Sequence, residues 1–281
     1  MTQKLNMSTE EKEIDGIFPE DYSFNLSDFA LFLSVMKNKK AYENVLSIIL
    51  DEDDLTLLDV KVEQVILNKC GKRAIRLDAW ALDEKNRQFN TEMQNDATQD
   101  DLRKRSRFYQ GMMDTPILKA GKQTRYKNLP STVIIFITQE DIFGKDLALY
   151  TFTEQCEEIQ GLHLEDGTTK IFLNMKSKNG RPELISLLQY MKNTTMENPE
   201  ILVKDERILS LSEIVEEVKQ SEEWEAVRMN ILEVGIQKGS KDKLKEQIKK
   251  KLTKGKTIPE IADALEEEVE TIEALIKEME Q

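Results

Sequence analysis

Two segments with alternating apolar and polar side chains, joined by a short polar turn, constrain the fold of this chain most strongly. Residues 73–82 (RAIRLDAWAL) and 87–94 (RQFNTEMQ) follow the period of two that indicates β-strands, and DEKN lies between them. We therefore expect a β-hairpin. A turn centred on Lys85 pairs residues whose numbers sum to 170, which places Asp78 opposite Glu92 on one face of the hairpin.

Two carboxylates in this relationship form a candidate metal-binding group. Directly opposite residues have β-carbons roughly 5 Å apart, and carboxylates that close repel each other at neutral pH. A divalent cation removes this cost, and Mg²⁺ prefers oxygen ligands from carboxylates, water and phosphate. Gln94 lies on the same face as Glu92. An exposed hairpin face with incidental polar residues remains an alternative, since a one-residue shift of the turn would break the pairing.

The other segments predict a mixed α/β layered fold. The run VIIFI is continuously apolar, which is typical of a buried central strand. Asn25 or Ser27 can cap the first helix, and Pro182 can begin the third. The expected helices are 28–50, 99–115 and 182–193, and the further expected strands are 61–69, 133–137, 147–152 and 169–173.

The C-terminal part has a different character, with charged helical segments and few aromatic residues. Residues 238–256 carry nine lysines against two acids, whereas 257–281 is strongly acidic. The segment 257–275 resembles a helix-turn-helix, with a Thr257 cap and Pro259 in the first turn. Its second helix offers glutamates where a DNA reader would need Arg, Lys or Asn, which favours packing or oligomerisation over DNA reading.

Composition limits the classes of protein to which the chain can belong. The predicted divisions are an N-terminal arm (1–24), a central α/β domain (25–200) and a charged helical extension (201–281). No run approaches the roughly 20 apolar residues of a membrane span, and the first residues lack the apolar core of a signal peptide, so a cytoplasmic location is expected. Cys70 and Cys156 show no metal-binding spacing. The single histidine, His163, nearly excludes histidine-based catalysis.

The net charge is −13, but a local basic stretch stands out against it. Residues 103–127 contain eight basic residues against one acid, Asp114. Such a patch matters more for contact with nucleic acid than the total charge does, although a solvated helix face is an equally open interpretation. In the same helix Leu102, Ser106, Tyr109 and Met113 recur at helical spacing. They indicate the core-facing side, unless Tyr109 reaches toward the metal site or a phosphate.

At these residues the chain resembles a known family. IRLDAWALDEKNRQFNTEMQN, followed by KRSRFYQGMMD, resembles the Rpn family of recombination-promoting nucleases, also called PD-(D/E)XK nuclease family transposases. The segments DFALFLSVMKN, VIIFITQEDIFG and LTKGKTIPEIADALEEEVETIEALIKE support the resemblance, which covers about 25–281. It implies a restriction-endonuclease-like α/β fold, in which a mixed sheet is flanked by helices and followed by a helical C-terminal extension.

The resemblance also implies roles for individual residues. Asp78 matches the Asp of the motif, Glu92 the (D/E), Met93 the X, and Gln94 the position usually held by Lys. Asp78, Glu92 and the Met93 carbonyl would then bind Mg²⁺ or Mn²⁺, with Glu43 of the first helix as a weaker candidate. Gln94 can orient a water molecule by hydrogen bonding, but it supplies no charge and exchanges no proton.

The function implied is a metal-dependent DNA endonuclease of recombination or transposition. Two alternatives remain open: a catalytically inactive DNA-binding descendant, which Gln94 makes thinkable, and a protein-interaction module built on the C-terminal helices. A homodimer through those helices is expected, with no membrane association. The residues expected to contact DNA are Arg103, Lys104, Arg105, Arg107, Tyr109, Lys122 and Arg125.

Overall fold

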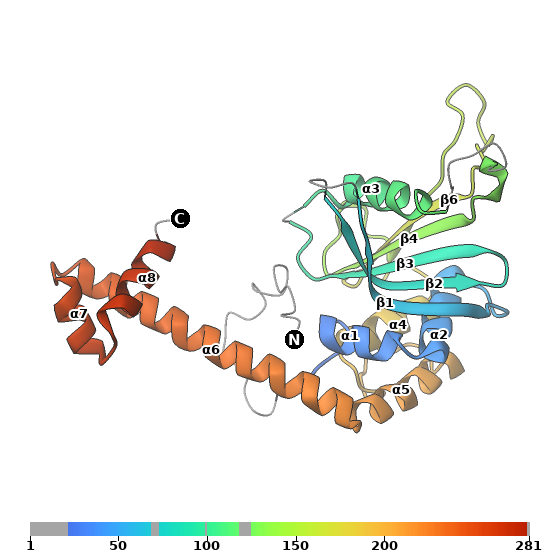
Figure 1. Cartoon of the computed structure of the whole chain (residues 1–281). Coiled ribbons are helices and arrows are strands. Elements are labelled where there is room, and N and C mark those ends of the chain that lie inside the picture. The colour runs from blue at the N-terminus through green and yellow to red at the C-terminus, as the bar shows by residue number, and fades with distance from the viewer. Residues whose placement is uncertain (1–21, 69–72, 99, 118–124, 280–281) are drawn as a thin grey trace. The chain divides into compact units, whose positions relative to one another are not determined.

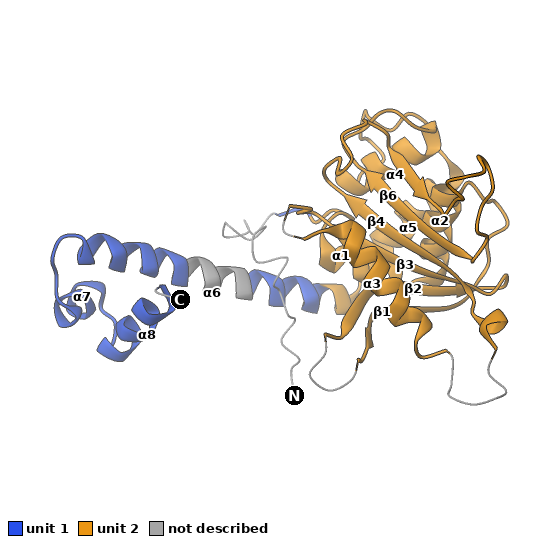
Figure 2. Cartoon of the chain, turned by 90° about the horizontal axis from the view of Figure 1, so that it is seen from above, with its two compact units in different colours: residues 1–23, 225–281 blue, residues 24–224 orange. Residues whose placement is uncertain are grey.

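The computed structural model describes residues 22–68, 73–98, 100–117 and 125–279. They form two compact units, one comprising Phe24–Trp224 and the other built on the residues from Glu225 onward (Figure 2). Cys70, Lys122 and most of the predicted arm 1–24 lie outside the described residues. Among the described residues, no helix combines the length and the apolar character that crossing a bilayer requires.

The larger unit is organised around a mixed sheet. Within the described residues, its six strands run in the order β1-β2-β3-β4-β6-β5. The first three are antiparallel neighbours, β4 joins β3 in parallel, β6 joins β4 in parallel, and β5 returns antiparallel to β6. This arrangement confirms the predicted fold class. The strands are β1 (Leu57–Ile66), β2 (Ile75–Asp83), β3 (Arg87–Gln94), β4 (Ser131–Thr138), β5 (Leu149–Phe152) and β6 (Thr168–Asn174).

Helices cover both faces of this sheet (Figure 1). One face carries α1 (Phe29–Met36), α2 (Lys39–Leu50), α4 (Pro182–Lys192) and α5 (Glu206–Lys219), and the other carries α3 (Leu102–Asp114). A short 3-10 turn, η2 (Tyr126–Asn128), precedes β4. Because layers lie on both faces, the apolar run in β4 is buried on both sides, as the sequence predicts for a central strand.

The helix predicted over 28–50 is wrong as a single element, because the chain breaks it in two. Asn38 has an extended backbone, and its side chain accepts hydrogen bonds from the N–H groups of Lys40 and Ala41. An asparagine that caps a new helix competes with continuation of the preceding one. The cap of α1 is also Asp28 rather than Asn25 or Ser27, and β1 begins four residues earlier than predicted.

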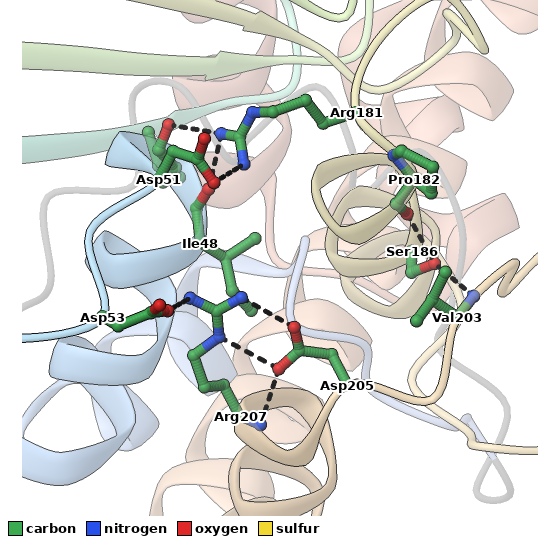
Figure 3. Close-up of polar contacts among 10 residues, drawn as sticks. Ile48, Asp51, Asp53, Arg181, Pro182, Ser186, Val203, Asp205 and Arg207 are labelled. Carbon is green, nitrogen blue, oxygen red and sulfur yellow. Dashed lines mark hydrogen bonds and ion pairs between the residues drawn. The ribbon is translucent and has the colours of Figure 1, made fainter.

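Two arginines hold the C-terminal end of α2 in place (Figure 3). Arg181 donates to the carbonyl oxygens of Ile48 and Ile49 at 2.8 and 3.1 Å, and to Oδ1 of Asp51 at 2.7 Å. Arg207 pairs with Asp53 at 3.0 Å. Carbonyls in the last turn of a helix lack partners within that helix, so Arg181 satisfies groups that burial would otherwise leave unpaired.

The anchored helix α2 contacts the hairpin through Tyr42. Tyr42 is fully buried, and its hydroxyl oxygen lies 2.9 Å from both the carbonyl oxygen of Ala79 and Oγ1 of Thr91. Ala79 and Thr91 face each other across β2 and β3. Asp78 and Glu92 come next along the two strands, so Tyr42 fixes the backbone from which both carboxylates project.

The smaller unit has its own apolar core. Its elements include α7 (Ile258–Leu265) and α8 (Val269–Met279), and α6 (Glu222–Leu252) begins in the larger unit and continues into it. Thr257 and Glu260 form a capping box at the start of α7. The core consists of Ile248, Ile261, Ala262, Ile272 and Leu275.

The predicted division at residue 200 does not coincide with the division between the two units. Helix α5 packs against α1 and α2 within the larger unit, although the sequence places residues 206–219 in the extension. The assignment of 201–281 to a separate folding domain stays a prediction.

Candidate active site

The β2–β3 hairpin adopts the predicted register. Ala79 pairs with Thr91 and Trp80 with Asn90, so the numbers of paired residues sum to 170. The turn is closed by Asp83, whose Oδ1 accepts the N–H of Arg87 at 2.7 Å. Asn86 takes the left-handed backbone conformation of a tight turn, with φ of 58°.

Asp78 and Glu92 form a buried pair of carboxyl groups, with exposed fractions of 7% and 1%. Oε1 of Glu92 accepts the N–H of Asp78 at 3.1 Å, and Oδ2 of Asp78 accepts the N–H of Met93 at 3.2 Å. The amide of Asn90 also donates to Oε1 of Glu92, at 3.0 Å. These bonds hold the two carboxyl groups against each other at the end of the paired part of the hairpin.

Burial perturbs both acids in the same direction. The pKa of Asp78 is raised well above its ordinary value, first by burial and then by the negative charge of Glu92. Burial also raises the pKa of Glu92, against the opposing effect of Arg105. Two acids whose charged forms are this unfavourable gain stability from any cation that reaches them.

The cation that the structure provides is Arg105, from α3. Its Nη2 donates to Oε2 of Glu92 and its Nη1 to Oε1 of Gln94, both at 2.9 Å. The hydroxyl of Tyr109, one helical turn away, accepts from Nε and Nη2 at 2.9 and 2.6 Å. The amide of Gln94 in turn donates to the carbonyl of Asp96 at 2.7 Å. One guanidinium therefore joins Glu92, Gln94 and Tyr109 into a connected group.

Sequence reasoning placed Arg105 with the DNA contacts and did not foresee this position. Arg105 and Tyr109 are separated by four residues, a spacing that puts them on one face of a helix. The ring of Tyr109 is buried in the core, as its core-facing spacing indicates, and its hydroxyl accepts from Arg105. A contact of Tyr109 with a metal or a phosphate stays a prediction. Asn90 was also missed, although it lies on the same strand face as Glu92.

Glu43 does not join this group. Its carboxylate accepts the N–H of Leu57 at the start of β1, at 2.9 Å, and lies 3.9 Å from Lys39. In the part of the chain that the structure describes, no third acidic, histidine or cysteine side chain completes a metal-binding cluster. The suggestion of Glu43 as a weaker ligand candidate stays a prediction; in the structure this side chain holds the start of β1.

The remaining basic candidates are exposed. Arg103 and Lys104 have side chains that are 64% and 76% exposed and lie near Asp101, which caps α3. Arg107 is exposed on the same helix, and Arg125 is exposed just before η2. Solvated cations beside a buried anionic site are available to a phosphate backbone.

Two observations fit a divalent cation at Asp78 and Glu92. Glu92 has an ion-pair partner in Arg105, whereas Asp78 has none among the described residues, so no ion pair offsets the charge of an ionised Asp78. Oδ1 of Asn90 is buried beside Glu92 and lacks a hydrogen-bond partner within the described residues. Carboxylate and amide oxygens are the ligands that Mg²⁺ and Mn²⁺ prefer.

Comparison with known proteins assigns the family. A family model for the PD-(D/E)XK nuclease family transposases matches residues 20–234, a range that contains the whole sheet and the helices on both of its faces. Searches of curated proteins and of solved structures found no significant match. PD-(D/E)XK nucleases generally use divalent metals. Since the match covers most of the chain, this protein belongs to the PD-(D/E)XK nuclease family transposases.

Proposed function

We propose that this protein is a metal-dependent DNA endonuclease that acts in recombination or transposition. The observation that carries the proposal is the pair of buried carboxyl groups, Asp78 and Glu92, brought together on adjacent strands in a family of nucleases. Buried like charges are costly to stability. A site that maintains them in this arrangement is suited to binding a cation.

Asp78 and Glu92 would hold Mg²⁺ or Mn²⁺ together with the carbonyl of Met93. The N–H of Met93 already donates to Asp78. In an extended strand the N–H and C=O of one residue point to the same side, so the Met93 carbonyl is directed toward β2. A divalent cation supplies Lewis-acid stabilisation of the phosphate and lowers the pKa of a water molecule.

Gln94 and the exposed basic residues have separate tasks in this proposal. Gln94 can orient the attacking water through its amide, but it provides no charge. Arg103, Lys104, Arg107 and Arg125 would contact phosphates of the DNA backbone, and Lys122, which lies outside the described residues, is proposed for the same role. Such contacts position the duplex without reading its sequence, so we expect binding that is weakly dependent on sequence and strongly dependent on salt.

One observation favours a second candidate, a DNA-binding protein without nuclease activity. The side-chain oxygen and nitrogen of Gln94 are both engaged, by Arg105 and by the Asp96 carbonyl. A glutamine held in this way is not free to orient water. This alternative predicts salt-dependent DNA binding without cleavage at any concentration of Mg²⁺ or Mn²⁺. A protein-interaction module would instead show no salt-dependent affinity for DNA.

Supercoiled plasmid distinguishes these functions. The wild type should nick or linearise plasmid with Mg²⁺ or Mn²⁺, and EDTA should abolish the reaction. Asp78→Asn keeps the shape of the side chain and should reduce the rate by about a hundredfold or more, the usual scale for loss of an electrostatic group at a reaction centre. Equal rates for wild type and Asp78→Asn would exclude the assignment.

The proposed homodimer through the C-terminal helices and the cytoplasmic location stay predictions. Sedimentation of the full chain tests the first, and fractionation of cells tests the second. The apolar residues of α7 and α8 already form a core with Ile248, so a dimer would have to use other side chains of these helices.

A further inference from the structure

Gln94 leaves the reaction centre without the positive charge that lysine brings to this motif, but the structure supplies one from another element. Arg105 reaches the same place from α3, 2.9 Å from Oε1 of Gln94. Its position is well defined: Asp101 caps the helix by accepting the N–H groups of Arg103 and Lys104. The guanidinium carbon lies 4.9 Å from the ring centre of Tyr109 and 5.7 Å from that of Phe136.

The hydrogen bonds of Arg105 leave part of the guanidinium available. A guanidinium has five N–H groups, and four of them are directed to Tyr109, Glu92 and Gln94. The fifth, on Nη1, has no partner among the described residues. The side chain is 20% exposed, so it is partly accessible to a ligand that approaches the site.

The ion pair with Glu92 has a consequence for metal binding. Oε2 of Glu92 accepts a hydrogen bond from Nη2 of Arg105, and Oε1 accepts from the backbone N–H of Asp78 and the side-chain amide of Asn90. Both oxygens of the proposed ligand are therefore occupied. A cation that binds Glu92 has to compete with Arg105 for its carboxylate.

We propose that Arg105 is an internal counter-ion of Glu92 that a divalent cation displaces, and that the released guanidinium then binds the scissile phosphate in place of the motif lysine. This inference rests on the proposed nuclease function. It assigns a catalytic role to a residue of α3, outside the hairpin. Arginine suits both partners, because its planar fork matches carboxylate and phosphate alike.

Two measurements on full-length Arg105→Gln test the two parts of the inference separately. The first is Mn²⁺ binding without DNA, by titration calorimetry. Loss of a charge-assisted competitor should tighten binding by about tenfold. The second is single-turnover plasmid cleavage at saturating Mn²⁺, which should fall by about a hundredfold because phosphate charge is no longer stabilised. Arg105→Lys keeps the charge, so its Mn²⁺ affinity and its cleavage rate should both lie between those of the wild type and Arg105→Gln.

The matched control is Arg207→Gln. Arg207 has a similar side-chain exposure, 23%, and pairs with Asp53 and Asp205 (Figure 3). It belongs to α5, which covers the opposite face of the sheet from α3 (Figure 1). Its loss should leave both Mn²⁺ affinity and cleavage unchanged. Thermal unfolding with and without Mn²⁺ tests whether each variant folds, and Arg105→Gln should gain more stability from Mn²⁺ than the wild type does.

The outcomes separate this inference from the function on which it rests. Unchanged or weaker Mn²⁺ binding by Arg105→Gln would overturn the counter-ion role, and undiminished cleavage would overturn the phosphate role. A wild type that cleaves nothing with any metal would overturn the nuclease function and the phosphate role together. In that case tighter Mn²⁺ binding by Arg105→Gln would still support the counter-ion role.

Discussion

The backbone N–H of Asp78 donates to the side chain of Glu92 at 3.1 Å, so one ligand candidate is held by the main chain of the other. This relationship couples the geometry of the two carboxyl groups to the hairpin register. The two groups differ in their electrostatic surroundings, because Glu92 has Arg105 as a partner and Asp78 relies on the N–H of Met93. Substitution of Asp78 and substitution of Glu92 should therefore change the stability of the metal-free protein in opposite directions.

Asp78→Asn should stabilise the protein in EDTA. The pKa of Asp78 is raised in the folded state, mainly by burial. The folded state therefore favours the protonated acid. The stability that protonated Asp78 contributes is complete below the ordinary pKa of about 3.9, and it is lost as the pH rises through the pKa of Asp78 in the folded protein. Asparagine can still accept from Met93 and carries no charge. Each unit of pKa elevation corresponds to about 1.4 kcal/mol.

The measurement is urea denaturation of both proteins in EDTA across the range from pH 4 to pH 8. The stability advantage of Asp78→Asn should be absent at the acidic end and grow as the pH rises. Saturating Mn²⁺ should reverse the order, because only the wild type keeps both carboxylate ligands. An advantage that does not change with pH would contradict the burial of an ionisable Asp78.

Glu92→Gln should have the opposite effect on the metal-free protein. It removes the anion that Arg105 contacts at 2.9 Å and leaves a largely buried guanidinium without its charged partner. We expect a loss of about 1–3 kcal/mol. Urea denaturation in EDTA measures it. Glu225→Gln, which removes the anion of a surface pair with Arg228, should change stability much less, because solvent screens that pair.

Tyr42→Phe should weaken the site from the opposite face of the sheet. The change leaves the buried Thr91 hydroxyl and the Ala79 carbonyl without their contact to the Tyr42 hydroxyl. The expected cost is about 1–2 kcal/mol of stability. Because Ala79 and Thr91 immediately flank Asp78 and Glu92, Mn²⁺ affinity should also fall. Calorimetry that shows wild-type Mn²⁺ affinity despite lower stability would limit Tyr42 to a structural role.

Replacing Arg103, Lys104 and Arg107 together with glutamine should weaken DNA binding across all sequences. For every side chain that touches a phosphate in the wild type, its replacement should reduce the slope of log affinity against log salt by about one. Fluorescence anisotropy over a range of salt concentrations measures this slope. The same substitution of Lys249, Lys250 and Lys251 in α6 tests the other lysine-rich stretch. A larger decrease of the slope in that variant would indicate that DNA contacts the C-terminal helices instead.

The hairpin was predictable because its determinants are local. Period-two alternation, a polar turn and the position of Lys85 predict the register that pairs Trp80 with Asn90, and no distant residue is needed. The continuous apolar run of β4 likewise predicts a strand buried on both faces. The break at Asn38 was not predicted because apolar residues at helical spacing lie on both sides of the polar segment 37–40 and were assigned to one helix. The side chain of one capping residue in that segment competes with continuation of the helix.

By itself, the sequence determined the mixed α/β fold, the hairpin and the positions of Asp78, Glu92 and Gln94 on one face of that hairpin, since these depend on patterns within a few residues. Only the tertiary structure decided what surrounds them. It places Arg105 against Glu92 and Gln94, and it commits Glu43 to the start of β1. Neither relationship has a sequence pattern, because each depends on how a helix docks on the sheet and on which side chain that docking brings within hydrogen-bonding distance.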